Sequence, residues 1–152
     1  MNIAKAFDEI YKYTHFLNWS ADWDILRKIY NTCPDSYSVL TPFAYSYLEE
    51  LIRSTTSEYG RELYDENGDQ KKFRKVGIQL VKLAIEENKL RNPEYVILLA
   101  SIKKYFTIST ANDIGDNRNS VHHGYMHPKY WNKESFEKLI IDIAIISKYS
   151  KF

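Results

Sequence analysis

The chain has 152 residues, 44% hydrophobic and 27% charged, which suits one domain with a hydrophobic core. Its net charge of +1 excludes a general basic field, so any contact with nucleic acid must come from a local patch. The single cysteine, Cys33, excludes an intramolecular disulfide, and no uncharged apolar run is long enough to span a membrane. We therefore expect a cytoplasmic protein with no membrane partner, in which Cys33 has a packing role.

Apolar residues in the first part of the chain recur every three or four positions, the spacing of amphipathic helices. This spacing predicts one helix over residues 2–18 and a second that Ser20 caps and Pro34 ends. Thr41 followed by Pro42 predicts the start of a third helix, because proline is favoured at the first helical position.

A turn follows at residues 65–69, where Asp-Glu-Asn-Gly-Asp combines several turn-forming residues. Asp69 can cap a fourth helix, with Phe73 and Val76 on its inner face. Residues 71–75 (Lys-Lys-Phe-Arg-Lys) would then form a solvated helix face, with a phosphate-binding patch as the alternative.

The remaining elements are also predicted to be helical. Residues 92–106 begin with a cap and a proline, and Asn132 or Lys133 opens a last helix with a wide apolar face. No segment shows the alternation of a strand. We expect an all-α bundle of about five to six helices, forming a single domain over residues 1–152. The thirteen tyrosines indicate helix seams, a subunit interface or a base-stacking surface.

Residues 117–127 hold three of the four histidines, together with an arginine and an amide. The side chains of Arg118, Asn119 and His123 have chemistry that suits the cleavage of RNA. A neutral imidazole can take the proton of the 2′-hydroxyl, and a guanidinium can hold the phosphate oxygens through two hydrogen bonds. Asn119 and His123 share a helix face, so the amide could orient the imidazole or contact phosphate.

Other interpretations of these residues remain open. His122 lies four residues after Arg118, which on a helix places both on one face, so His122 could be the base or a supporting residue. Arg118 could instead form a structural ion pair with Asp113 or Asp116. His123 and His127 have a metal-ligand spacing, but no further ligand lies near them in sequence, so we expect no metal and no cofactor.

In an in-line cleavage the attacking oxygen and the leaving oxygen lie on opposite sides of one phosphorus. The attacking oxygen must lose a proton and the leaving oxygen must gain one. A single His123 cannot easily perform both transfers. A twofold axis would bring a second Arg118 and His123 to the same cleft, so we expect a homodimer with a composite site.

The segment Arg-Asn-Ser-Val-His-His, residues 118–123, resembles the Arg-x4-6-His motif of HEPN domains in its Arg-Asn-x-x-x-His form. Its place before the last helix of a small all-α chain is similar too. The resemblance implies a HEPN-like helical bundle with catalytic Arg118 and His123 and a supporting Asn119. It also implies a dimeric, metal-independent endoribonuclease of a toxin–antitoxin, abortive-infection or CRISPR-associated defence system.

A narrower resemblance adds Tyr125, because Arg118-x4-His123-x-Tyr125 is similar to the pattern of HepT-type HEPN toxins. In that family a partner nucleotidyltransferase antitoxin attaches AMP to the tyrosine and silences the toxin. Tyr125 could equally be a stacking platform for a base.

The sequence thus predicts an RNA-cleaving enzyme. Two alternatives remain: a non-catalytic helical module that dimerises or binds a partner protein, and a sensor domain in which Arg118 and the histidines hold a nucleotide phosphate.

Overall fold

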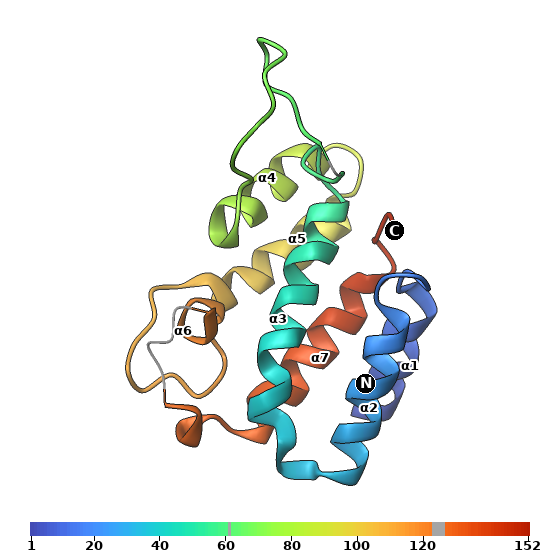
Figure 1. Ribbon diagram of the computed structural model, residues 1–152, viewed down its shortest axis with the longest axis vertical. Helices are drawn as coiled ribbons and strands as arrows, with labels where there is room; N and C mark the ends of the chain where they lie inside the picture. The colour runs from blue at the N-terminus through green and yellow to red at the C-terminus, as the bar shows by residue number, and fades with distance from the viewer. Residues whose placement is uncertain (61, 123–126) are drawn as a thin grey trace.

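The structure is a computed structural model, and it describes residues 1–60, 62–122 and 127–152. Its central element is α3 (Tyr37–Ser54), which lies against α4, α6 and α7 (Figure 1). Ten of the 18 residues of α3 are buried, so this helix forms the middle of the hydrophobic core. The prediction of an all-α bundle is confirmed.

The described part of the chain contains seven α-helices and three short 3-10 helices. The α-helices are α1 (Ile3–Tyr13), α2 (Ser20–Thr32), α3, α4 (Gly77–Asn88), α5 (Pro93–Ile102), α6 (Arg118–His122) and α7 (Lys133–Ser147). The 3-10 helices are η1 (Pro34–Ser36), η2 (Lys103–Phe106) and η3 (Pro128–Tyr130). Within these described ranges, no helix is long and apolar enough to cross a lipid bilayer.

The core forms where α1, α3 and α7 pack together, with α2 beside α1 (Figure 1). The apolar spacing predicted Ile10, Leu48 and Leu139 to face inward, and all three are fully buried. Asn132 was a predicted start for the last helix, and its side chain accepts a hydrogen bond from Ser135 N at 2.8 Å. That bond satisfies one of the free N–H groups of the first turn.

Buried tyrosines connect the helices through their hydroxyl groups. Tyr105 donates to Asp142 of α7 at 2.6 Å, and Tyr45 of α3 donates to the carbonyl oxygen of Gly115 at 3.1 Å. Of the three roles that the tyrosine content indicated, a position in helix seams is the one that these side chains have.

Several predicted helix boundaries are wrong. α3 begins at Tyr37 and contains Pro42 in its interior. Proline removes one backbone donor there, and the burial of the helix outweighs that loss. α1 ends at Tyr13, which leaves Leu17 74% exposed, and Cys33 at the end of α2 is exposed and not packed.

The predicted fourth helix also begins later than expected. Asp69 does not cap it, and α4 starts at Gly77. Residues 57–60 and 62–76 instead form an extended hairpin, here called the arm, which projects from the helices (Figure 1). An isolated antiparallel bridge joins Tyr64 to Gln70, and the Asp65 side chain accepts the N–H groups of the turn. These local bonds compete with a helix.

Gly115 lies in the loop before α6, and Gly68 at the tip of the arm serves as a control for how tightly that loop packs. Gly115 has φ of 90°, and a Cβ there would lie 3.1 Å from Cβ of Trp131. Gly68, at the arm tip, has φ of 83° and no atom within 4 Å of its Cβ position. Both substitutions to alanine force a left-handed conformation, which costs about 1–2 kcal/mol. Gly115→Ala should lower the free energy of unfolding in urea by about 1–3 kcal/mol more than Gly68→Ala, because of the overpacking against Trp131. Equal losses would contradict this packing.

Candidate functional site

The start of α6 is fixed by Asn117, which is only 4% exposed. Its Oδ1 accepts a hydrogen bond from Asn119 N at 2.9 Å, as an N-terminal capping residue does. Its Nδ2 donates to the carbonyl oxygen of Thr107 at 3.3 Å and to Oγ1 of Thr107 at 3.1 Å. The first turn of α6 is thereby tied to the segment that leaves η2.

Arg118, the first residue of α6, forms an ion pair with Glu49 of α3. Nη2 of Arg118 lies 3.0 Å from Oε2 of Glu49, and each side chain is 12% exposed. The other oxygen of Glu49 accepts a hydrogen bond from the backbone N–H of Gly77, the first residue of α4, at 2.7 Å. One carboxylate therefore joins three helices.

The guanidinium of Arg118 has unused donor capacity. Its Nε is buried, and no hydrogen-bond partner for it exists among the described residues. An unmet donor in a charged group is costly, and a ligand or water could satisfy it. Arg118 is thus oriented by Glu49 without being saturated by it.

The alternative partners proposed for Arg118 have other contacts. Asp113 accepts hydrogen bonds from Oγ of Ser120 and from N and Oγ1 of Thr110, the latter two at 2.9 and 2.7 Å. Asp116 accepts from Ile114 N at 3.3 Å. The structural ion pair exists, but its acid is Glu49.

Asn119 directs its Nδ2 to the carbonyl oxygen of Thr107 at 2.8 Å. Its Oδ1 lies 3.9 Å from where a Cβ of Gly77 would stand. The nitrogen of this amide therefore ties α6 to Thr107, the residue that follows η2.

The histidines differ in how far the structure places them. His122 ends α6 and is exposed, and its spacing of four residues from Arg118 on one short helix puts both on the same side. His123 and Tyr125, the predicted base and the predicted point of control, lie outside the described residues. His127 packs edge-on against Tyr130, with 6.0 Å between ring centroids.

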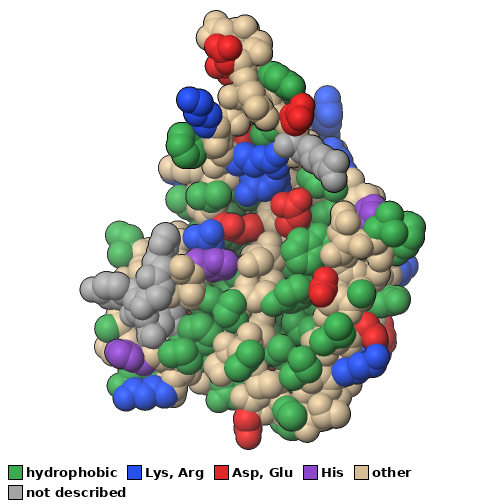
Figure 2. All heavy atoms as spheres, in the orientation of Figure 1, with side chains coloured by type: hydrophobic (Ala, Val, Ile, Leu, Met, Phe, Trp, Pro, Cys, Tyr) green, Lys and Arg blue, Asp and Glu red, His purple; other side chains and the backbone are tan. Residues whose placement is uncertain are grey.

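Charged side chains of both signs gather around this junction. Figure 2 shows Lys or Arg, Asp or Glu, and His side chains beside one another in the middle of the face, where α3 is flanked by α4 and α6 in Figure 1. Among the residues that the structure places, no three His, Cys, Asp or Glu side chains converge as a metal site would require.

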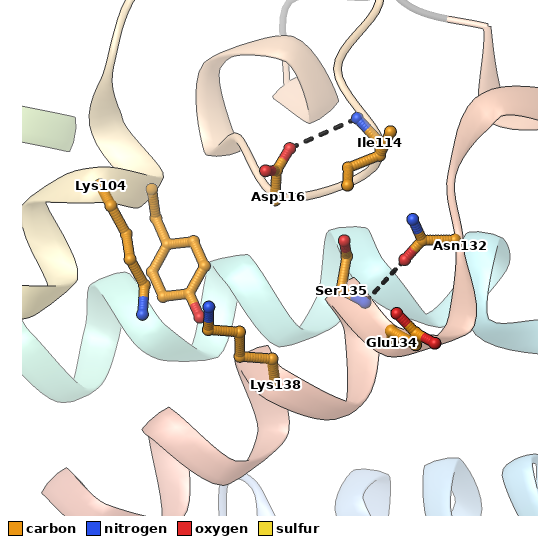
Figure 3. Close-up of a pocket in the computed structure, with 8 residues that line it drawn as sticks. Lys104, Ile114, Asp116, Asn132, Glu134, Ser135 and Lys138 are labelled. Carbon is orange, nitrogen blue, oxygen red and sulfur yellow. Dashed lines mark hydrogen bonds between the residues drawn. The ribbon is translucent and has the colours of Figure 1, made fainter.

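A separate cavity of about 300 Å³ lies beside the start of α7 (Figure 3). Lys104 and Lys138 lie on one side of it and Glu134 on the other, with Ser135 between them. Lys104 is bound to Asp142 at 2.6 Å. Arg118 and Asn119 do not line this cavity, so it is distinct from the junction around Glu49.

Comparisons of the chain with protein-family models, curated proteins and solved structures found no match. The resemblance of residues 118–123 to the HEPN motif therefore remains a prediction from the sequence.

Sequence reasoning missed Glu49, although a signal for it exists. In the 18 residues of α3 the only charged side chains are Glu49, Glu50 and Arg53. A carboxylate on a helix that is mostly buried needs a partner, because an unpaired buried charge is strongly unfavourable. The helix pattern alone would not have named Arg118 as that partner, 69 residues away.

Removing one member of the Arg118–Glu49 pair should be costly. Glu49→Ala leaves a largely buried guanidinium unpaired and should lower the free energy of unfolding by about 3 kcal/mol. The double variant Glu49→Leu/Arg118→Met should recover part of that loss, because no charge is left unpaired. Glu86→Ala, which removes the partner of Lys89 in an exposed pair, is the control and should change stability by no more than about 0.5 kcal/mol. Equal losses for Glu49→Ala and Glu86→Ala in urea denaturation would contradict the buried pair.

Asp113 should make the loop before α6 sensitive to acid. Burial by itself raises the pKa of Asp113, but the hydrogen bonds from Ser120 and Thr110 outweigh it and lower the pKa below its usual range. A lowered pKa in the folded state stabilises the protein above the unfolded-state pKa, and this contribution is lost as the pH falls through the folded-state pKa.

Wild type should therefore be more stable than Asp113→Asn near pH 6, and the difference should shrink as the pH falls toward about 3. Urea denaturation across that range measures it. Asp35→Asn, at an exposed position, is the control. A difference that stays constant with pH would show that the charge of Asp113 is not what stabilises the loop.

Proposed function

We propose that this protein is a metal-independent endoribonuclease in which Arg118 holds the scissile phosphate of RNA. The observation that carries the proposal is the state of Arg118. Its guanidinium is oriented by Glu49 at 3.0 Å, yet its Nε has no partner among the described residues. His122 stands on the same side of the same helix, so a cation and an imidazole are presented together.

In the proposed reaction an imidazole takes the proton of the 2′-hydroxyl, and the oxygen attacks the adjacent phosphorus. The 5′-oxygen leaves and takes a proton from a second acid, so the products carry 2′,3′-cyclic phosphate and 5′-hydroxyl ends. Arg118 stabilises the extra charge on the non-bridging oxygens through terminal N–H groups of its guanidinium that do not point at Glu49. The role of Glu49 is to hold the planar fork in one orientation.

We assign the imidazole to His123, as the HEPN resemblance implies, with His122 as the competing base. Asn119 would support the site through the contacts of its side chain with Thr107. Because two protons must move on opposite sides of the phosphorus, the site would be completed by a second copy of the chain across a twofold axis.

The proposal places the protein in a toxin–antitoxin or phage-defence system. An antitoxin of the nucleotidyltransferase type would attach AMP to Tyr125. As the resemblance implies, this bulky anion would block RNA from the cleft.

A second function has an observation in its favour. Glu49 offsets the charge of Arg118, and the pair joins α3, α6 and α4. If that contact were only structural, the chain would be a non-catalytic helical module that dimerises or binds a partner protein. A nucleotide-binding sensor is a weaker version of the same idea, in which the guanidinium holds a nucleotide phosphate.

Purified protein in EDTA should cleave single-stranded RNA and leave 2′,3′-cyclic phosphate ends. Arg118→Lys keeps the charge but loses the planar fork, so cleavage should fall by about 100-fold or more. Arg27→Lys alters an exposed arginine paired with Asp8 and should cleave as wild type does. Thermal unfolding of both variants checks that the fold is retained.

The histidine variants identify the base. His123→Ala should lower cleavage by about 100- to 10,000-fold, whereas His122→Ala should have a smaller effect. The reverse order would make His122 the base. Cleavage that appears only with added divalent metal, or an active monomer in solution, would contradict the mechanism. A complete lack of cleavage by folded wild type would favour the helical module.

A further inference from the structure

The arm carries an exposed aromatic side chain between basic residues. Phe73 is 87% exposed, the largest exposed fraction of any phenylalanine among the described residues. Lys71 and Lys72 precede it and Lys75 follows it, and all three are exposed. Since these residues lie on an extended segment and not on a helix, the expectation of a solvated helix face for 71–75 is wrong.

Apart from Glu58 and Glu62, the acidic residues of the arm lie at its tip. These are Asp65, Glu66 and Asp69, and the Asp65 carboxylate accepts the N–H groups of Asn67 and Asp69. The basic residues lie on the limb that returns to the helices. Figure 2 shows acidic side chains at the end of the projection and side chains of both charges nearer the body. The returning limb therefore concentrates the basic residues Lys71, Lys72, Arg74 and Lys75, whereas the acidic Glu62 lies on the facing limb of the hairpin.

The root of the arm is held by a buried ionic network. Arg53 is 8% exposed and donates from Nη1 to the carbonyl oxygen of Lys75 at 2.9 Å. Glu58 is 4% exposed and accepts a hydrogen bond from Lys75 N at 2.6 Å. The backbone at Lys75, where the basic limb ends, is thus fixed to α3 through Arg53 and to the start of the arm through Glu58, so the limb keeps its direction.

The same limb leads into the candidate site. Two residues after Lys75, the N–H of Gly77 donates to the carboxylate of Glu49 that also holds Arg118. Phe73 is four residues before Gly77, so an extended chain separates them by no more than about 14 Å.

We propose that the returning limb of the arm binds single-stranded RNA, with Phe73 stacking on a base and Lys71, Lys72 and Lys75 contacting phosphates. An exposed aromatic ring accepts any base, and flanking lysines supply sequence-independent attraction to the backbone. In the proposed function, on which this part of the inference rests, the arm delivers the strand to Arg118. Single strands fit better than a duplex, because only unpaired bases offer their faces for stacking.

The test measures binding separately from cleavage. A fluorescent, 2′-O-methylated single-stranded RNA cannot react through its 2′-hydroxyl, so its anisotropy reports binding alone. Phe73→Ala should weaken binding about tenfold, given the usual contribution of base stacking. Lys71→Ala/Lys72→Ala should weaken binding and reduce the slope of log Kd against log salt by about 1.4, roughly 0.7 for each lost phosphate contact.

Matched controls lie on α1 and just after it. Phe16 is 74% exposed, and Phe16→Ala should bind as wild type does. Lys5→Ala/Lys12→Ala removes the same charge from exposed positions of α1 and should leave the salt slope nearly unchanged. Urea denaturation of each variant checks the fold.

The outcomes separate this inference from the proposed function. It is overturned if wild type does not bind the probe, or if Phe73→Ala binds no worse than Phe16→Ala. If wild type cleaves unmodified RNA while the arm variants bind and cleave normally, the endoribonuclease stands and the arm has no such role. If the arm variants lose binding but wild type never cleaves RNA, the arm is an RNA-binding element of a non-catalytic protein.

Discussion

The carboxylate of Glu49 is the constraint on which the site depends. It stands on the most buried helix of the chain and joins the guanidinium of Arg118 to the first backbone N–H of α4. Both charges are largely removed from water. Removal of either partner would therefore leave the other charge buried and unpaired, which is strongly unfavourable. α6 has only five residues and could not hold its position by its own hydrogen bonds, so this pair and Asn117 fix it.

Arg53, a buried arginine one turn after Glu49 on the same helix, performs a similar task. Arg53 fixes the backbone of the arm at Lys75, much as Glu49 fixes the start of α4. The arm and the candidate site are therefore anchored to neighbouring positions of α3.

The ion pairs made by the charged residues of α3 do not follow from the periodicity of the sequence. The apolar spacing identified the core residues Leu48 and Leu51, but it gave no reason to pair Glu49 with Arg118 or Arg53 with Glu58. Such pairs depend on how the helices pack, which local periodicity does not encode. Local rules also failed where two signals competed: Asp69 had the chemistry of a helix cap, but the turn bonds of Asp65 favoured a hairpin.

The sequence by itself determined the all-α class, most inward-facing residues and the start of the last helix at Asn132, because these follow from hydrophobic spacing and capping. It also singled out Arg118 and Asn119 by their chemistry. Only the tertiary structure decided that Glu49 orients Arg118, that Asn119 contacts Thr107, and that residues 71–75 form an exposed limb beside the site. The reason is physical: helix formation depends on neighbours in sequence, whereas the pairing of buried charges depends on contacts between segments far apart in the chain.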